Sequence, residues 1–78
     1  MYPNLLGQKE SRKLSNQDMA EIIGVSRSAY EQKIRSGKFT PLECAAYCNY
    51  FNKPFDYLFI TESELDELYS KKASNLRI

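Results

Sequence analysis

The sequence has no histidine, only three glycines and no long apolar run. The absence of histidine removes the most common general acid–base residue and a frequent metal ligand. The glycines Gly7, Gly24 and Gly37 stand too far apart to form a phosphate-binding loop. These absences argue against an enzyme, a cofactor and a small-molecule substrate. We therefore expect a binding module.

The apolar runs, such as Tyr57 to Ile60, are short and far from the roughly 20 residues that cross a bilayer. The first residues, Met1 to Lys9, lack the apolar core of a signal peptide. We therefore expect a cytoplasmic protein with no membrane partner. The 78 residues suffice for one domain with a modest core.

Cysteine is scarce, and the two cysteines, Cys44 and Cys48, lie four positions apart. On a helix both thiols could face one metal ion, but no histidine or third cysteine completes a site. A free cysteine behaves as a small hydrophobe, and a disulfide is unfavourable in a reducing compartment. We assign both cysteines to the core and expect no metal.

The net charge is +1, but the charges are unevenly distributed. Between Lys9 and Lys38 there are seven cations and four acids. A mildly basic middle permits nucleic-acid binding and does not by itself demonstrate it. Four acids follow between Glu62 and Glu67, and we interpret them as the solvated first turns of a capped helix. Lys71 and Lys72 near its expected end suit the helix macrodipole.

Apolar spacing, glycine and proline predict helices and no strand. We expect a first helix at residues 4–13 capped by Asn4, a second after the Ser15 cap, a third at 27–36, and a fourth beginning at Thr40-Pro41. A short fifth helix has Phe55 and Leu58 on its apolar face. A last helix spans about 62–71, with residues 73–78 frayed. The sequences Ser15-x-x-Asp18, Thr40-x-x-Glu43 and Thr61-x-x-Glu64 are typical capping boxes.

The second and third helices are joined by Gly24-Val25-Ser26, a short turn that contains glycine. This arrangement is typical of a helix-turn-helix. Ala20 is small where the helices would cross, and Val25 and Tyr30 would fill the angle between them. The polar face of the third helix would then point outward.

The run from Leu14 to Ser28, L-S-N-Q-D-M-A-E-I-I-G-V-S-R-S, resembles the L-T-Q-E-E-L-A-x-x-L-G-V-S-R-S signature of the Xre family, the lambda-type phage repressors and Cro proteins. The resemblance continues through Thr40-Pro41 and an apolar stripe that ends at Leu58, and it covers about residues 4–60. It departs from the commonest pattern by one extra residue between Gly24 and Gly37. The stripe consists of Cys44, Tyr47, Cys48, Phe51, Phe55 and Leu58.

The resemblance implies an all-α, compact five-helix, lambda-repressor-like DNA-binding domain at residues 1–60. Residues 61–78 would add a short C-terminal helix and tail. It also implies a repressor of a phage or mobile element that binds operator DNA as a homodimer, with the third helix in the major groove. Transferred position by position, it assigns DNA contacts to Asn16, Gln17, Ser26, Arg27, Ser28, Glu31, Gln32, Arg35 and Lys38.

Within this set, Asn16 would contact phosphate from the start of the second helix, where the family often has glutamine. Base reading would fall to Arg27, Ser28 and Gln32, since arginine pairs with guanine and glutamine with adenine. Phosphates flanking the groove would be bound by Arg35 and Lys38. Glu31 would accept a hydrogen bond from cytosine, pair with Arg27 or Arg35, or exclude wrong sites.

Three alternatives stay open at this point. The polar face of the third helix could also be an ordinary solvent-exposed helix surface that binds no DNA. The apolar residues Leu65, Leu68 and Tyr69 would form either a dimer seam or a face packed on the chain's own helices. A protein–protein module with the same fold, such as an antitoxin or adaptor, would expose an apolar patch around Tyr50, Tyr57, Leu65 and Tyr69.

Overall fold

The computed structural model describes residues 1–76, with side chains for residues 1–70. The described residues form helices and contain no strand, which confirms the expected all-α class. The helices are α1 (Pro3–Ser11), α2 (Asn16–Ile23), α3 (Arg27–Ser36), α4 (Pro41–Phe51), α5 (Phe55–Leu58) and α6 (Glu62–Leu76). None of these helices combines the length and the apolar character that a membrane span requires.

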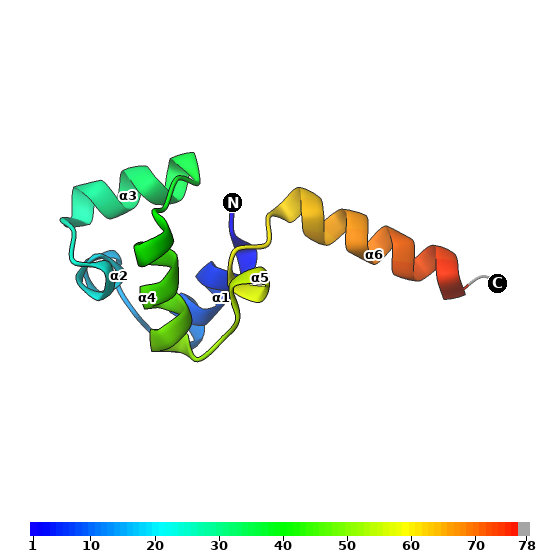
Figure 1. The fold of residues 1–78 in the computed structure, drawn as a ribbon, viewed down its shortest axis with the longest axis horizontal. Coiled ribbons are helices and arrows are strands. Elements are labelled where there is room, and N and C mark those ends of the chain that lie inside the picture. The colour runs from blue at the N-terminus through cyan, green and yellow to red at the C-terminus, as the bar shows by residue number, and fades with distance from the viewer. Residues whose placement is uncertain (77–78) are drawn as a thin grey trace.

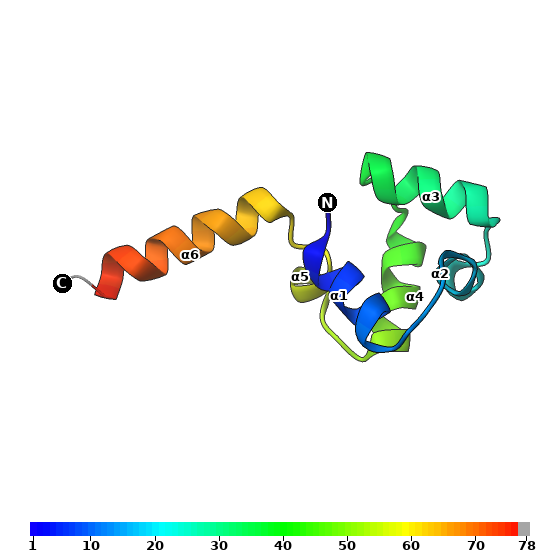
Figure 2. The same cartoon turned by 180° about the vertical axis from the view of Figure 1, so that it is seen from behind.

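Helices α1 to α5 surround one core, whereas α6 projects away from them (Figures 1 and 2). The molecule is consequently elongated, with dimensions of 49 × 23 × 22 Å. The buried residues all come from α1–α5 and the residue that follows α5. They are Leu5, Met19, Ala20, Tyr30, Tyr47, Phe51, Leu58 and Phe59.

The centre of the core is aromatic. Phe39 meets Tyr47 edge to face with ring centroids 5.7 Å apart, and Tyr47 stacks on Phe51 at 6.1 Å. Such pairs contribute about 0.5–1.5 kcal/mol beyond the area they bury. The Tyr47 hydroxyl donates a hydrogen bond of 2.8 Å to the carbonyl of Met19. The interior of α4 is thereby joined to α2.

Two glycines end α2 and α3 in the way the sequence predicts. Gly24 has φ +70° after α2, and Gly37 has φ +75° after α3, a region that residues with a Cβ rarely adopt. At Gly37 space is also restricted, since a Cβ would lie 2.8 Å from the Met1 sulfur. The Tyr2 hydroxyl donates to the Gly37 carbonyl at 2.6 Å. The end of α3 is therefore held by the start of the chain.

The first helix differs from its prediction at both ends. It begins at Pro3 with Tyr2 as N-cap, because proline is favoured at the first helical position. The Asn4 side chain instead donates to the Tyr57 carbonyl at 2.9 Å, which ties α1 to α5. The helix ends at Ser11, and Lys13 then takes a left-handed backbone with φ 56°.

The apolar stripe is only partly buried, and the prediction for Phe55 was wrong. Phe55 is 59% exposed, while Leu58 and Phe59 are buried. α5 is a single turn from Phe55 to Leu58, and only the residue at its end, Leu58, faces the core. Cys44 and Cys48 are half-buried at the edge of the core, against which they pack.

The last helix is longer than expected. Its backbone continues past Lys71 to Leu76, so the predicted end at about residue 71 was too early. Residues 77 and 78 lie outside the described residues, and so do the side chains of Lys71 and Lys72. The alternative in which Leu65, Leu68 and Tyr69 pack back on the body is also not what the structure has, because all three are exposed.

Candidate nucleic-acid interface

The turn at residues 24–26 sets the angle between α2 and α3. The Val25 N–H donates to the Ala20 carbonyl at 3.1 Å, directly after left-handed Gly24. Ala20 and Tyr30 are fully buried at the junction, and Val25 packs against the core. These three side chains are thus turned toward the core. α3 consequently lies along one edge of the body (Figure 1).

The outer face of α3 is accessible to solvent. Ser28, Gln32 and Arg35 are exposed, whereas Tyr30 is 1% exposed on the opposite side of the helix. Asn16 and Glu31 are partly buried. The other residues assigned by the resemblance are all exposed: Gln17, Ser26, Arg27 and Lys38.

Glu31 connects the two helices of the motif. Its Oε2 accepts a hydrogen bond of 3.0 Å from Asn16 Nδ2 of α2 and another of 3.0 Å from Arg27 Nε of α3. The hydrogen bond from Asn16, followed by that from Arg27, holds the pKa of Glu31 below its ordinary value. Of the predicted roles for Glu31, pairing with Arg27 is therefore present. Arg27 uses only Nε for this contact, so both terminal nitrogens remain for a further acceptor.

Gln17 and Ser26 also make local contacts. Gln17 Nε2 donates to Glu21 Oε2 at 3.1 Å on the outer side of α2. Ser26 is the N-cap of α3, and its hydroxyl oxygen accepts the Ala29 N–H at 3.1 Å. Since a hydroxyl is both donor and acceptor, the Ser26 proton remains able to donate elsewhere.

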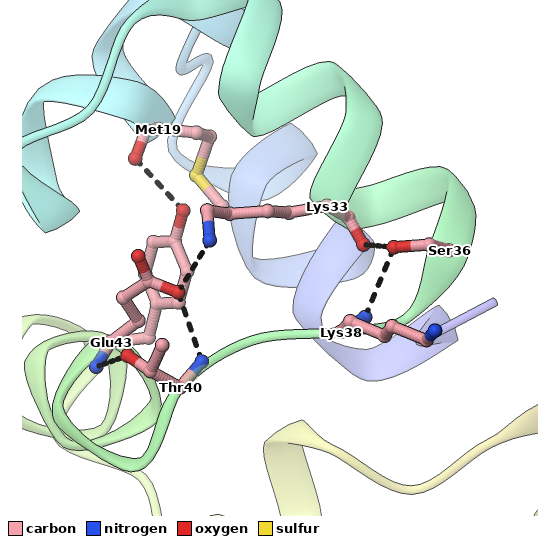
Figure 3. Close-up of polar contacts among 7 residues, drawn as sticks. Met19, Lys33, Ser36, Lys38, Thr40 and Glu43 are labelled. Atoms are coloured by element: carbon pink, nitrogen blue, oxygen red, sulfur yellow. Dashed lines mark hydrogen bonds and ion pairs between the residues drawn. The ribbon is translucent and has the colours of Figure 1, made fainter.

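The two lysines at the end of α3 have different roles (Figure 3). Lys33 Nζ lies 3.1 Å from Glu43 Oε1, and these side chains are only 25% and 13% exposed. Burial raises the pKa of Glu43, but hydrogen bonds from the Thr40 backbone and from Lys33 outweigh it and leave the pKa lowered. Lys33 thus joins α3 to the start of α4. The Lys38 side chain points away from this cluster and is exposed.

A second cation of the basic stretch also serves the fold. Arg12 Nη2 donates to the Phe51 carbonyl at 3.2 Å, and its guanidinium lies 5.1 Å from the centroid of the Phe51 ring. It therefore holds the end of α1 against the end of α4. The basic middle of the sequence is divided between structural cations and exposed ones.

A shallow hollow of about 360 Å³ lies between residues of α1, α2 and α3. It brings Lys9 of α1 beside residues that the resemblance had assigned. The first N–H groups of α2, at Asn16 and Gln17, have no acceptor within the helix because of their position. Sequence analysis missed Lys9, since no local pattern links it to α2. The lining residues are Lys9, Ser15, Asn16, Gln17 and Arg27.

The cysteines do not form a metal site with other residues. Within the described residues no group of three or more histidine, cysteine or acidic side chains is placed to hold a metal ion. Burial raises the pKa of both Cys44 and Cys48, which disfavours the thiolate that a metal would need.

Comparison with protein-family models, curated proteins and solved structures finds no match to the chain.

Proposed function

We propose that the chain is a sequence-specific DNA-binding regulator of transcription with a lambda-repressor-like fold, which inserts α3 into the major groove. The supporting observation is the exposed polar face of Ser28, Gln32 and Arg35, directly after a left-handed turn and opposite buried Tyr30. A helix held in this way by its partner helix is the element that helix-turn-helix proteins use to reach base edges.

Base recognition would come from the first two turns of α3. Gln32 can bind adenine N6 and N7 with both ends of its amide, and Arg27 can bind guanine with its terminal nitrogens. Ser28 accepts or donates and so tolerates several bases. Glu31 positions Arg27, because the 3.0 Å hydrogen bond restrains the guanidinium before DNA arrives.

Phosphates would be bound at two places, the start of α2 and the end of α3. The hollow at the start of α2 places Lys9 near the N–H groups of Asn16 and Gln17. Lys9 is paired with Glu10 at 3.5 Å and its side chain is only 15% exposed, so the two N–H groups are the part of this hollow that suits an anion. At the other end of α3, Arg35 and Lys38 are exposed. Such contacts determine register on the duplex and make affinity dependent on salt.

We further propose that the protein acts as a repressor of a phage or mobile element in the cytoplasm, needing no cofactor. It would bind a two-fold operator as a homodimer and exclude polymerase from the promoter. A subunit with a net charge of +1 gains little non-specific affinity for DNA alone. A dimer that binds two half-sites would reach a higher affinity than one subunit on one half-site.

The test is to select bound duplexes from a random DNA pool and then measure two variants by mobility shift. Gln32→Ala should relax base preference at one position by about 1–3 kcal/mol. Lys38→Ala should weaken all duplexes alike and reduce the slope of log affinity against log salt by about 1. Lys53→Ala, an exposed cation beyond the opposite end of α4, is the control and should change neither.

Failure to bind any duplex at low ionic strength would overturn the proposed function. Unchanged binding by both Gln32→Ala and Lys38→Ala would remove α3 and the residues that follow it from the interface.

A protein–protein module is the second candidate, because Tyr50, Tyr57, Leu65 and Tyr69 are all exposed. They line separate surfaces, since Tyr50 borders a groove between α2 and α4 while Tyr57 and Leu65 border one beside α5 and α6. Salt distinguishes the two candidates. DNA binding weakens steeply with ionic strength, whereas binding through an apolar surface does not.

A further inference from the structure

A mostly apolar hollow of about 610 Å³ is lined by α4, α5 and the segment that precedes α4. Side chains from three separate segments make it concave, and its volume lies in the range of about 300–1,000 Å³ that is common for small-molecule sites. None of the residues assigned to DNA contacts lines it. The lining residues are Phe39, Pro41, Cys44, Ala45, Cys48 and Phe55.

Two phenylalanine rings line the hollow, and both rest on a third ring of the core. Phe39 meets Phe59 edge to face with ring centroids 5.9 Å apart, and Phe55 stacks on Phe59 at 5.2 Å. Phe59 is buried, whereas Phe55 is 59% exposed. The two rings are therefore held in place without a ligand, which lowers the entropic cost of binding one.

Two thiols complete the lining and carry no charge at neutral pH. Cys44 and Cys48 lie one turn apart on α4 and are half-buried. Burial is the main cause that raises the pKa of both thiols; the neighbouring Cys48 and Glu43 raise that of Cys44 further, and Asp56 raises that of Cys48. Among the described residues, those that line the hollow include no charged side chain. A charged ligand would lose hydration there without gaining an ion pair.

The hollow lies where the apolar stripe of α4 and α5 has no covering element. Tyr47 and Leu58 of this stripe are fully buried, but its two cysteines are half-buried and Phe55 is largely exposed. Along α4 the lining extends from Pro41 to Cys48, which is about 10 Å of helix. This length accommodates one aromatic ring or two fused rings.

We propose that the hollow binds a small neutral aromatic molecule of one or two rings. The ligand packs against the rings of Phe39 and Phe55, and the thiols of Cys44 and Cys48 contact the edge of its ring. Because Phe39 lies between α3 and α4, an occupied hollow also adds contacts to the segment that follows α3. The inference goes beyond DNA binding and does not depend on it, since ligand binding is measured without DNA.

The first experiment titrates the full chain with 2-naphthol, which is neutral at pH 7, and follows the amide signals by NMR. Saturable shifts should centre on Ala45, Cys48 and Phe55. Phe55→Ala should raise the Kd by about tenfold, because the ligand loses one aromatic wall.

Tyr50→Ala is the matched control for Phe55→Ala. Tyr50 is also an exposed aromatic residue, but it lines the groove between α2 and α4 instead. Its removal should leave the Kd for 2-naphthol nearly unchanged. Both variants remove exposed rings, and the dispersion of their NMR spectra checks that both stay folded.

The second experiment locates the ligand and tests its chemical class. Saturating 2-naphthol should slow the alkylation of Cys44 and Cys48 by iodoacetamide about fivefold or more, because it covers both thiols. The anion 2-naphthoate has the same two rings and should bind about tenfold more weakly than 2-naphthol.

The absence of saturable shifts up to the solubility limit of 2-naphthol would overturn the proposal, and so would an equal loss of affinity in Tyr50→Ala and Phe55→Ala. Thiols that 2-naphthol does not protect would exclude this hollow as its site. Equal binding of 2-naphthoate would overturn the requirement for a neutral ligand. Tighter binding of a pentapeptide with one tryptophan among four alanines would assign the hollow to a protein partner instead.

Discussion

Helices α4 and α6 begin with the same local structure and end in different surroundings. Thr40 Oγ1 accepts the Glu43 N–H at 3.2 Å, and Thr61 Oγ1 accepts the Glu64 N–H at 3.2 Å. Yet Tyr47 of α4 is completely buried, whereas α6 is exposed from Glu62 to Ser70. The capping box therefore determines where a helix starts and not whether the helix is packed.

The difference between the two helices follows from the density of their apolar residues. Within residues 42–51, α4 is almost continuously apolar, and its sides contact α2 and α5. In the first half of α6 the apolar residues Leu65, Leu68 and Tyr69 stand among acids. A capping residue contributes about 1 kcal/mol, while a buried aromatic residue contributes several. Burial thus separates a core helix from one that is available to a partner.

The largest expected effect contrasts Tyr47 with Tyr69. Tyr47→Ala should lower the free energy of unfolding by about 3–5 kcal/mol, because it leaves a cavity in the core and removes the hydrogen bond to Met19. Tyr69→Ala should change it by less than about 0.5 kcal/mol in a dilute sample, since that side chain is 76% exposed. Urea denaturation of both variants measures the difference. Equal losses would mean that α6 is part of the folded core.

A smaller difference in global stability is expected between variants of the two capping threonines, Thr40 and Thr61. Thr40→Ala should cost about 1 kcal/mol of global stability, because the start of α4 is part of the cooperative body. Thr61→Ala should leave the urea midpoint unchanged and reduce the helical signal in circular dichroism, because only α6 loses its cap. A shift of the midpoint for Thr61→Ala would contradict the separation of α6 from the body.

The smallest effect is the pH dependence of the two capping glutamates. The pKa of Glu43 and that of Glu64 both lie below the ordinary value of 4.5. A carboxyl group whose pKa is lowered by folding stabilises the folded state above pH 4.5. This stabilisation is lost as the pH falls through the folded-state pKa. Glu43→Gln should therefore reduce the loss of global stability in acid, whereas Glu64→Gln should leave it as in wild type. Thermal unfolding at pH 6 and at pH 3 to 4 tests both variants.

Much of the helical structure could be predicted because its signals are local. The caps at Ser15 and Thr40 and the left-handed residues Gly24 and Gly37 act over one turn. The exposure of Ser28 and Gln32 on α3 also follows from helical periodicity. What these residues bind is not decided by periodicity, and that part remains a prediction.

The errors arose where the outcome depends on contacts distant in sequence. Asn4 was predicted to cap α1 but hydrogen-bonds to Tyr57. Phe55 has the apolar character of a core residue but is 59% exposed, and its ring stacks on the buried Phe59 from outside with centroids 5.2 Å apart. The pairing of Lys33 with Glu43 was not predicted at all, because it joins α3 to α4 across ten positions of the sequence.

The linear order of residues was thus enough for the all-α class, the turn at Gly24 and most helix starts, because each depends on backbone preferences over a few neighbouring positions. Only the three-dimensional packing decided which cations are available on α3, brought Lys9 beside α2 and left α6 uncovered. These outcomes depend on which side chains compete for the same space and charge, and that competition exists only once distant segments meet.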